Sequence, residues 1–367
     1  MKILILANPA NPHTIKWANS LNAEGIEVYL FGLNKYDRSS FNENIKIEIF
    51  NVPQKLLINE YGSFSKIFYL ASLIKIKNYI KKIKPDILHA HYISSYGLLG
   101  ALTNFHPYFI SVWGSDIYNV PQKNFVYRKL IEHSLNKADR IMSTSFAMAH
   151  QTKRYTKKEI SVIPFGIDTD KFKPMKVDSI FKKETFIIGT IKTLEKKYGI
   201  EYLIRAFNLV KEKLPSITLK LLIVGSGKLD NYLKKLTAEL NLENDIIFTG
   251  YIAPDQIPRY HNMLDIYAAL SIEDSESFGV AALEASACEK PVVVSDVSGF
   301  AEVVKNNITG FVVERKNIQL AADAMIKLVK DKALRDEMGR SGREHVKKMY
   351  SWNNNVKQMI NIYKQPI

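Results

Sequence analysis

Two glutamates, Glu276 and Glu284, stand eight residues apart on either side of a Ser-Phe-Gly turn at residues 277–279. The apolar run after the turn predicts a helix over residues 279–287. The first turn of a helix carries unpaired backbone N–H groups and the positive end of the helix dipole, which suit a phosphate. Two turns of helix place Glu284 about 12 Å beyond Glu276. A ligand with a sugar at one end, phosphates in the middle and a ribose at the other spans that distance.

Basic side chains gather in the stretch 189–203, which contains Lys192, Lys196 and Lys197. A phosphate leaving group gains negative charge, which a metal ion or cationic side chains can stabilise. Asp168-Thr-Asp170 has the spacing of a metal-binding pair, but it stands in a connecting stretch, and we expect no metal there. The lysines are then left to bind the phosphates. The alternative is that they belong to a solvated loop.

Polar residues also end two predicted strands in the first half of the chain. His91 ends one strand, and Trp113 and Asp116 follow the next. Ligands of α/β domains gather beyond the carboxyl ends of strands, so these side chains and His13 in the first loop are candidates to face a second substrate. Asp116 is the best candidate for a catalytic carboxylate, with a helix cap as the alternative. For His89 we expect a buried, hydrogen-bonded imidazole.

The elements that must position these residues alternate along the chain. Strands are predicted at 2–7, 27–31, 45–49, 86–90, 108–113, 140–144, 186–190, 218–224, 246–249, 266–270 and 292–295. Helices are predicted at 14–24, 64–84, 96–103, 124–137, 199–213, 229–240, 257–262, 279–287, 318–330 and 332–348. Such alternation predicts parallel sheets with right-handed crossovers, here in two doubly wound domains.

Composition narrows the class of protein. The chain has 367 residues, 46% of them hydrophobic, and a net charge of 51 − 37 = +14, which favours an anionic partner. The single cysteine, Cys288, excludes an intramolecular disulfide and fits a reducing compartment. No apolar run is long enough to span a membrane. We therefore expect a cytoplasmic protein. The basic helix at 64–84 is interpreted either as an ordinary surface helix or as a peripheral contact with anionic lipid at the inner face of the cell membrane.

The chain resembles the retaining glycosyltransferases of family 4 along nearly its whole length. The likeness rests on the Glu276–Glu284 segment, and on the stretch 189–203, which looks like the family's diphosphate-binding loop with Lys192 in place of the usual arginine. The chain departs from the family where Ser298-Gly299-Phe300 replaces a common Gly-Gly-x-Pro, and at Trp113, where many members have histidine. The donor sugar is therefore left unassigned.

The resemblance implies the GT-B fold, in which two Rossmann-like domains face each other across a cleft. An acceptor-binding domain is expected at residues 1–165 and a nucleotide-sugar-binding domain at 166–350. The final helix, in residues 351–367, is expected to return to the first domain. The sequence itself shows only that this tail is amphipathic.

The resemblance also assigns roles to individual residues. Glu276 would accept hydrogen bonds from the donor sugar, Glu284 would bind the ribose, and Lys192 and Lys197 would hold the diphosphate. The remaining donor-site residues are Ser277, the amides of Phe278, Gly279 and Val280, the backbone of Tyr251 near the base, and Gly225 packed beside the nucleotide. The expected catalytic residues are Glu276, Lys197, Lys192 and Asp116, and the expected acceptor-binding residues are His13, His91 and Trp113.

The implied activity is a metal-independent, retaining hexosyltransferase without a cofactor. Its donor would be a nucleotide-diphosphate sugar and its acceptor a glycan or a lipid-linked molecule, in polysaccharide or glycolipid assembly. The departing β-phosphate would take the acceptor's proton. Three alternatives stay open: a nucleotide-sugar epimerase of the same fold, a basic membrane- or nucleic-acid-binding protein without catalysis, and an inactive partner of another transferase. The lysines lack the interleaved aromatic residues of a single-strand binding surface, so no nucleic acid is expected.

Overall fold

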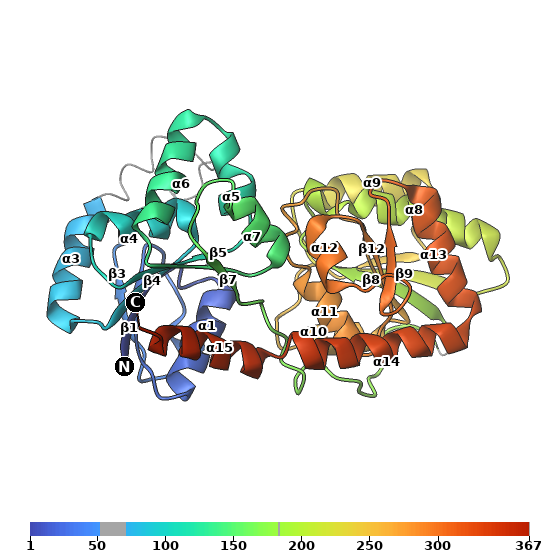
Figure 1. Ribbon diagram of the computed structural model, residues 1–367. Helices are drawn as coiled ribbons and strands as arrows, with labels where there is room; N and C mark the ends of the chain where they lie inside the picture. The colour runs from blue at the N-terminus through green and yellow to red at the C-terminus, as the bar shows by residue number, and fades with distance from the viewer. Residues whose placement is uncertain (52–70, 183, 367) are drawn as a thin grey trace. The chain divides into compact units, whose positions relative to one another are not determined.

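The computed structural model of the chain describes residues 1–51, 71–182 and 184–366. They form two compact units. Unit 1 consists of Met1–Pro164 with Asn355–Ile367, and unit 2 of Phe165–Asn354. Each unit is a parallel sheet with helices on both faces, which confirms the prediction of two doubly wound domains (Figure 1).

The sheet of unit 1 has the strand order β3-β2-β1-β4-β5-β6-β7, with every neighbouring pair parallel. The strands are β1 (Lys2–Leu6), β2 (Glu27–Gly32), β3 (Lys46–Ile49), β4 (Ile87–His91), β5 (Tyr108–Val112), β6 (Arg140–Ser143) and β7 (Ile160–Val162). The helices are α1 (Pro12–Ala23), α3 (Ser72–Ile83), α4 (Leu98–Thr103), α5 (Ser115–Tyr118), α6 (Phe125–Lys137), α7 (Phe146–Thr152) and α15 (Trp352–Lys364), which begins in unit 2. The strand order reverses between β1 and β4, where ligands of such sheets bind.

The helices of unit 1 cover both faces of its sheet. Because side chains alternate along a strand, Leu88 and Ile110 point toward α3, α4 and α6. His89 and Phe109 point to the opposite face, where Tyr363 of α15 stacks on Phe109 at 6.0 Å between ring centroids. The described end of the chain therefore packs on the first sheet (Figure 1).

The helix predicted at 64–84 is described only from Ser72 to Ile83, and residues 64–70 lie outside the described residues. Ile76 and Ile83 of α3 are buried in the core of unit 1. The exposed side chains include Lys77, Lys81 and Lys82. This part of the helix thus exposes lysines together with Ile74, while Ile76 and Ile83 face the core.

The sheet of unit 2 has the strand order β10-β9-β8-β11-β12-β13, again all parallel. The strands are β8 (Phe186–Ile191), β9 (Leu219–Val224), β10 (Ile246–Phe248), β11 (Ile266–Ala269), β12 (Val292–Ser295) and β13 (Gly310–Val313). The helices are α8 (Ile200–Lys213), α9 (Asp230–Glu239), α10 (Ile257–Met263), α11 (Val280–Ala287), α12 (Ser298–Val303), α13 (Ile318–Lys330) and α14 (Lys332–Met349). The order reverses between β8 and β11.

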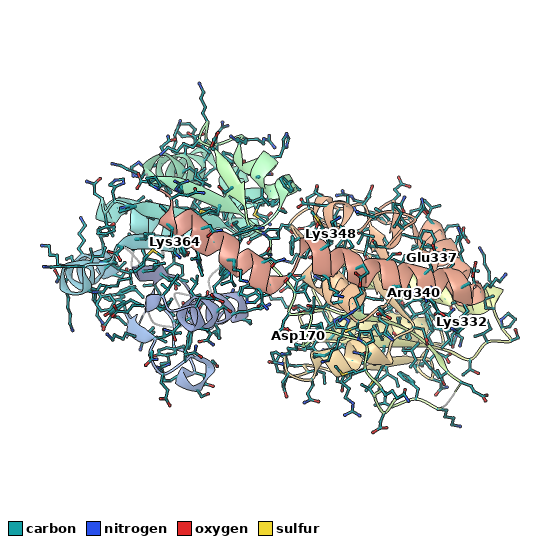
Figure 2. The ribbon with its side chains drawn as sticks, turned by 60° about the horizontal axis from the view of Figure 1, so that its bottom comes forward. Asp170, Lys332, Glu337, Arg340, Lys348 and Lys364 are labelled. Atoms are coloured by element: carbon teal, nitrogen blue, oxygen red, sulfur yellow. The ribbon has the colours of Figure 1, made fainter. Side chains whose placement is uncertain are left out.

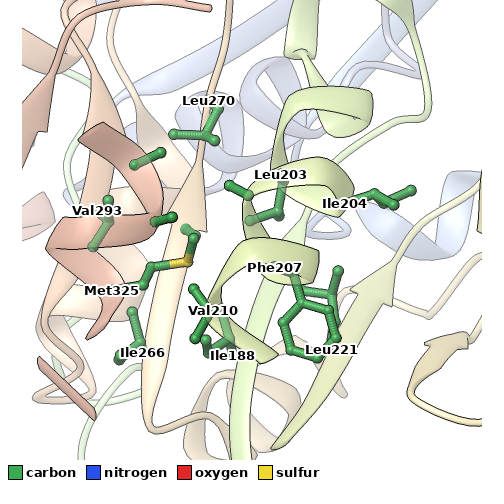
Figure 3. Close-up of a cluster of buried hydrophobic side chains, with 14 of the residues drawn as sticks. Ile188, Leu203, Ile204, Phe207, Val210, Leu221, Ile266, Leu270, Val293 and Met325 are labelled. Carbon is green, nitrogen blue, oxygen red and sulfur yellow. The ribbon is translucent and has the colours of Figure 1, made fainter. Parts of the chain in front are cut away.

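The core of unit 2 lies between its sheet and the helices α8, α9 and α13. Figure 3 shows the α8 residues Leu203, Phe207 and Val210 laid over Ile188 and Ile266 of the central strands. Their burial holds α8 against this face of the sheet.

The opposite face of this sheet is covered by α10 and α11, and α14 packs on α11. Figure 2 shows α14 running from Lys332 to Lys348, with Glu337 and Arg340 on its exposed side. A Cβ atom on Gly339 would lie 2.2 Å from the carbonyl oxygen of Glu289, so only glycine lets α14 approach the end of α11 this closely.

Candidate functional site

Residues predicted for the donor site follow four neighbouring strands of unit 2 at one edge of the sheet. Lys192 comes directly after β8, Gly225 after β9, Tyr251 shortly after β10, and Glu276 in the loop after β11. The carboxyl ends of parallel strands share one edge, and β8 and β11 flank the switch point of this sheet. The topology therefore gathers residues that are far apart in the sequence.

Lys192 and Glu276 form an ion pair at this edge. Lys192 Nζ lies 2.5 Å from Glu276 Oε2, and the two side chains are only 13% and 8% exposed. Glu276 Oε1 accepts a hydrogen bond of 3.1 Å from the amide of Gly279, at the N-terminus of α11. The carboxylate thus has a cation on one oxygen and the positive end of a helix at the other.

This arrangement corrects one part of the predicted phosphate site. The Gly279 amide is engaged by Glu276, because the loop before α11 is short enough for the carboxylate to fold back onto the helix end. Within the residues that the structure describes, the amides of Val280 and Ala281 donate no hydrogen bond. The two amides of the first helical turn are therefore left to bind an anion, whereas the Gly279 amide is not.

The ammonium groups of Lys197 and Lys192 both contact the aromatic ring of Tyr198. The Nζ atoms of both lysines lie 4.7 Å from the centroid of the Tyr198 ring, a distance typical of cation–π contacts. Burial acts to lower the pKa of Lys197, but Tyr198 and the carboxylates of Glu195 and Glu276 outweigh it and hold the pKa above its ordinary value. Lys197 is therefore a cation at neutral pH. Tyr198 thus contacts the ammonium groups of both lysines.

Close backbone contacts hold the lysine loop against the sheet. Gly225 has φ +136°, and a Cβ atom there would lie 2.0 Å from the carbonyl oxygen of Lys192. Gly199 has φ +60°, and its Cβ atom would lie 2.0 Å from the carbonyl oxygen of Leu270, after β11. Both positions require glycine. The contact at Gly225 brings β9 close to the backbone of Lys192.

The loop that carries Glu276 is supported by α12. A Cβ atom on Gly299 would lie 2.2 Å from the carbonyl oxygen of Glu276 and 2.5 Å from the amide nitrogen of Phe278. The side chain of Asp274 accepts hydrogen bonds of 2.8 Å from both the amide and the hydroxyl of Ser298. The Ser298-Gly299 start of α12 therefore fits against the backbone of Glu276.

Glu284 lies one turn inside α11 beside a histidine that the sequence did not indicate. His261 Nε2 of α10 is 3.4 Å from Glu284 Oε2, and the histidine is fully buried while Glu284 stays 19% exposed. The rings of Phe172 and Tyr267 enclose the imidazole at 5.9 and 5.6 Å. No local pattern points to His261, because its link to Glu284 arises only when α10 packs on α11.

The other predicted donor-site residues differ in exposure. Ser277 and Phe278 are buried, and the Phe278 ring packs against Phe165 and Tyr350 at 6.0 and 5.6 Å. The side chain of Phe278 is therefore not available to a ligand. Tyr251 is 72% exposed, so a ligand can reach it.

In unit 1 the three predicted acceptor-binding residues lie together. Ring centroids are 6.0 Å apart for His13 and Trp113, 4.7 Å for Trp113 and His91, and 4.5 Å for His91 and His89. Burial lowers the pKa of His91 to about 3, so this imidazole is neutral at physiological pH. His89 is hydrogen-bonded by Tyr363 and Ser111 at 2.6 and 2.8 Å, as expected for a buried structural histidine.

Asp116, which was predicted to be a catalytic carboxylate, instead makes structural hydrogen bonds. It is fully buried, and its carboxylate accepts hydrogen bonds from the amides of Ile93, Trp113 and Gly114 at 2.9, 3.2 and 2.7 Å. Burial raises its pKa to about 6 despite these bonds. The side chain turns back from α5 onto the backbone after β4 and β5, so it joins two loops and no substrate can reach it.

No three histidine, cysteine or acidic side chains come together among the described residues as a metal site would need, and Asp168 accepts hydrogen bonds of 3.0 Å from the amides of Asp170 and Lys171 in a local turn. No helix in the described ranges has the length and apolar character needed to cross a membrane.

Two family profiles match the chain in succession. The profile named glycosyl transferase 4-like matches residues 2–145, and the profile named glycosyl transferases group 1 matches residues 172–345. The first match lies within unit 1. The second lies within unit 2 and contains Lys192, Glu276 and Glu284.

Individual relatives show the same likeness. N-acetyl-alpha-D-glucosaminyl L-malate synthase of Bacillus anthracis is 28% identical over 330 residues, covering 84% of this chain and 82% of the relative. A GDP-mannose-dependent alpha-(1-6)-phosphatidylinositol monomannoside mannosyltransferase of Mycobacterium tuberculosis is 29% identical over 204 residues, or 53% of this chain and 52% of that protein. The match thus spans about half the length of the second relative. The structure of Anabaena HepE in complex with UDP-glucose has a TM-score of 0.78 at 19% identity, over 99% of each chain, which shows a shared fold.

Proposed function

Because the chain belongs to the group 1 glycosyltransferases and has their GT-B fold, we propose that it transfers a hexose from a nucleotide-diphosphate sugar to a glycan or lipid-linked acceptor. In this proposal the reaction retains the anomeric configuration and needs no metal ion or cofactor. Unit 2 binds the donor and unit 1 the acceptor. The relatives' names support a sugar nucleotide as donor.

The observation that carries the proposal is the group of charges at the carboxyl edge of the second sheet. Lys192 and Lys197 flank Tyr198, and Glu276 joins Lys192 to the N-terminus of α11. Two ammonium groups and the free amides of Val280 and Ala281 suit a diphosphate. Glu276 would accept hydrogen bonds from the sugar, and Glu284, farther along α11, from the ribose.

The chemical step follows from which groups can take a proton. Asp116 is buried among three backbone amides, and His91 is neutral but enclosed between His89 and Trp113. Neither suits a general base. We therefore assign the acceptor's proton to the departing β-phosphate, on the face from which it leaves. Lys192 and Lys197 would stabilise the charge that grows on the diphosphate as the bond to the sugar breaks.

For the acceptor, we propose that the rings of His13 and Trp113 in unit 1 contact the sugar, while the buried His91 packs against Trp113. Flat aromatic faces suit the apolar faces of sugar rings. The exposed lysines Lys77 and Lys81 of α3 add charge attraction to an anionic membrane surface, which would suit a lipid-linked acceptor. The relative from M. tuberculosis, by its name, acts on a phosphatidylinositol mannoside.

The test is turnover with sugar nucleotides in the presence of EDTA. The purified protein is incubated with UDP- or GDP-sugars and a panel of glycan and lipid-linked acceptors, and the anomer of the product is read by NMR. The α-anomer from an α-linked donor is expected. Glu276→Ala and Lys197→Ala should each abolish transfer while keeping the thermal unfolding transition. Normal turnover by both variants would refute the site, and epimerisation of the donor without any acceptor would favour the epimerase.

A further inference from the structure

Lys192 and Glu276 hold each other in a nearly closed environment. Their contact is 2.5 Å long and the side chains are 13% and 8% exposed. Removing one partner of a buried ion pair is unfavourable, because the other charge then stays buried without compensation. A ligand that binds the ammonium group of Lys192 must therefore also supply a hydrogen-bond donor to the carboxylate of Glu276.

We propose that this ion pair makes the site select the intact nucleotide-sugar over the free nucleoside diphosphate, an inference that rests on the proposed function. The diphosphate binds the ammonium group of Lys192, and hydroxyl groups of the sugar donate hydrogen bonds to Glu276 Oε2. A nucleotide-sugar replaces both halves of the pair. A nucleoside diphosphate replaces only one half and leaves Glu276 without a partner for that oxygen.

The surroundings of the pair allow this exchange without collapse of the loop. Lys192 Nζ keeps the Tyr198 ring at 4.7 Å as a second partner. Glu276 keeps the hydrogen bond from the Gly279 amide to its other oxygen, Oε1. Each group therefore retains one fixed contact while the contact between them opens.

The exchange has a consequence for product release. Once the sugar has been transferred, no hydroxyl group of the donor remains at Glu276. The carboxylate and Lys192 then attract each other again, and the diphosphate loses one of its cations. Re-formation of the pair favours departure of the product.

The variant Glu276→Gln isolates the charge of the pair. The glutamine carbonyl oxygen can still accept the hydrogen bond from Gly279, so the start of α11 keeps its contact. Glutamine no longer holds Lys192 as a counter-ion. In this variant the diphosphate no longer competes with a carboxylate for Lys192. The nucleoside diphosphate should therefore bind Glu276→Gln at least about 10-fold more tightly than it binds the wild type. The intact donor should gain less, because its sugar loses a charged acceptor.

The measurement is isothermal titration of the whole protein with UDP, GDP and ADP, and with UDP-glucose and GDP-mannose. The readout is the dissociation constant of the nucleoside diphosphate divided by that of its sugar conjugate. This ratio should exceed 1 for the wild type and fall in Glu276→Gln, because the nucleoside diphosphate gains more affinity there than its sugar conjugate does. The matched control is Asp245→Asn, which breaks another ion pair, with Lys211 and Lys220, at the amino edge of the same sheet, and should leave the ratio unchanged.

Three results would overturn the inference. An unchanged ratio in Glu276→Gln, with binding that is weakened by Lys192→Gln, would leave the donor site in place and refute the exchange. A nucleoside diphosphate that binds Glu276→Gln more weakly than the wild type would also refute it. If no nucleotide binds the folded wild type, the proposed function fails together with the exchange.

Discussion

Replacing His261 with leucine is predicted to weaken nucleotide binding by releasing Glu284 from its position. His261 is fully buried and its Nε2 atom lies 3.4 Å from Glu284 Oε2. The other ring nitrogen, Nδ1, has no hydrogen-bond partner among the described residues. Leucine therefore removes one hydrogen bond to the carboxylate and fills much of the same apolar space between Phe172 and Tyr267.

The expected loss of binding free energy in His261→Leu is that of the single hydrogen bond between His261 and Glu284. Hydrogen bonds to charged groups contribute about 1.5–3 kcal/mol, and a distance of 3.4 Å is at the long end of the range, so we take about 1 kcal/mol. This corresponds to a factor of about 5 in the dissociation constant. His261→Gln places an amide nitrogen near the position of Nε2 and should recover most of the loss.

The assay compares UDP, GDP and ADP with their 2′,3′-dideoxy analogues by isothermal titration. Glu284 can bind the ribose hydroxyls of the first set and finds none in the second. His261→Leu should therefore weaken binding of the ribonucleotides by about 5-fold and leave the dideoxy analogues nearly unchanged. Equal losses for both sets would show that His261 acts on the fold in general, and would refute its role in holding Glu284.

Three further predictions concern single contacts. Gly299→Ala should weaken nucleotide binding at least about 10-fold, because the added Cβ would lie 2.2 Å from the carbonyl oxygen of Glu276; wild-type affinity would contradict the close fit. Tyr363→Phe should lower the unfolding free energy of unit 1 by about 1–3 kcal/mol, since it leaves His89 Nδ1 buried without its partner; an unchanged melting temperature would argue against the docking of α15. The pKa of Asp116 is about 6 in the folded chain and 3.8 ordinarily, so the folded state binds its proton more tightly, and this group's contribution to stability should fall by about 2 kcal/mol as the pH rises from about 4 to 6. Asp116→Asn should lack that slope in unfolding free energy measured against pH, and equal slopes in the two proteins would show that Asp116 is not the cause.

Much of the candidate site in unit 2 was predictable because it follows from strand order. Lys192 and Glu276 stand 84 residues apart, yet each follows a strand that flanks the switch point, and parallel strands end at one edge. The N-terminus of α11 was indicated by the Ser-Phe-Gly turn before an apolar run. The partner of the Gly279 amide was not, because only the folded loop shows that Glu276 reaches back to it.

The direction of the side chains after β4 and β5 in unit 1 could not be predicted from the sequence. The position of Asp116 after a strand suits a catalytic carboxylate as well as a structural one, and only the fold shows three amides around it. His261 was missed because its contact with Glu284 depends on helix packing. Short elements were missed too: β7, α7, α12 and β13 have between three and seven residues, too few for a clear hydrophobic period.

The central claim, a donor site in unit 2 that needs no metal, is tested most directly by thermal unfolding with nucleotides. The purified protein is screened with UDP, GDP, ADP, CMP and their common sugar conjugates, without added metal and then with EDTA. A ligand that binds the folded state raises the melting temperature by mass action. We predict a rise with one nucleoside diphosphate and its sugar conjugate that persists in EDTA and is lost in Glu284→Ala. No rise with any nucleotide, or a rise that EDTA abolishes, would contradict the claim.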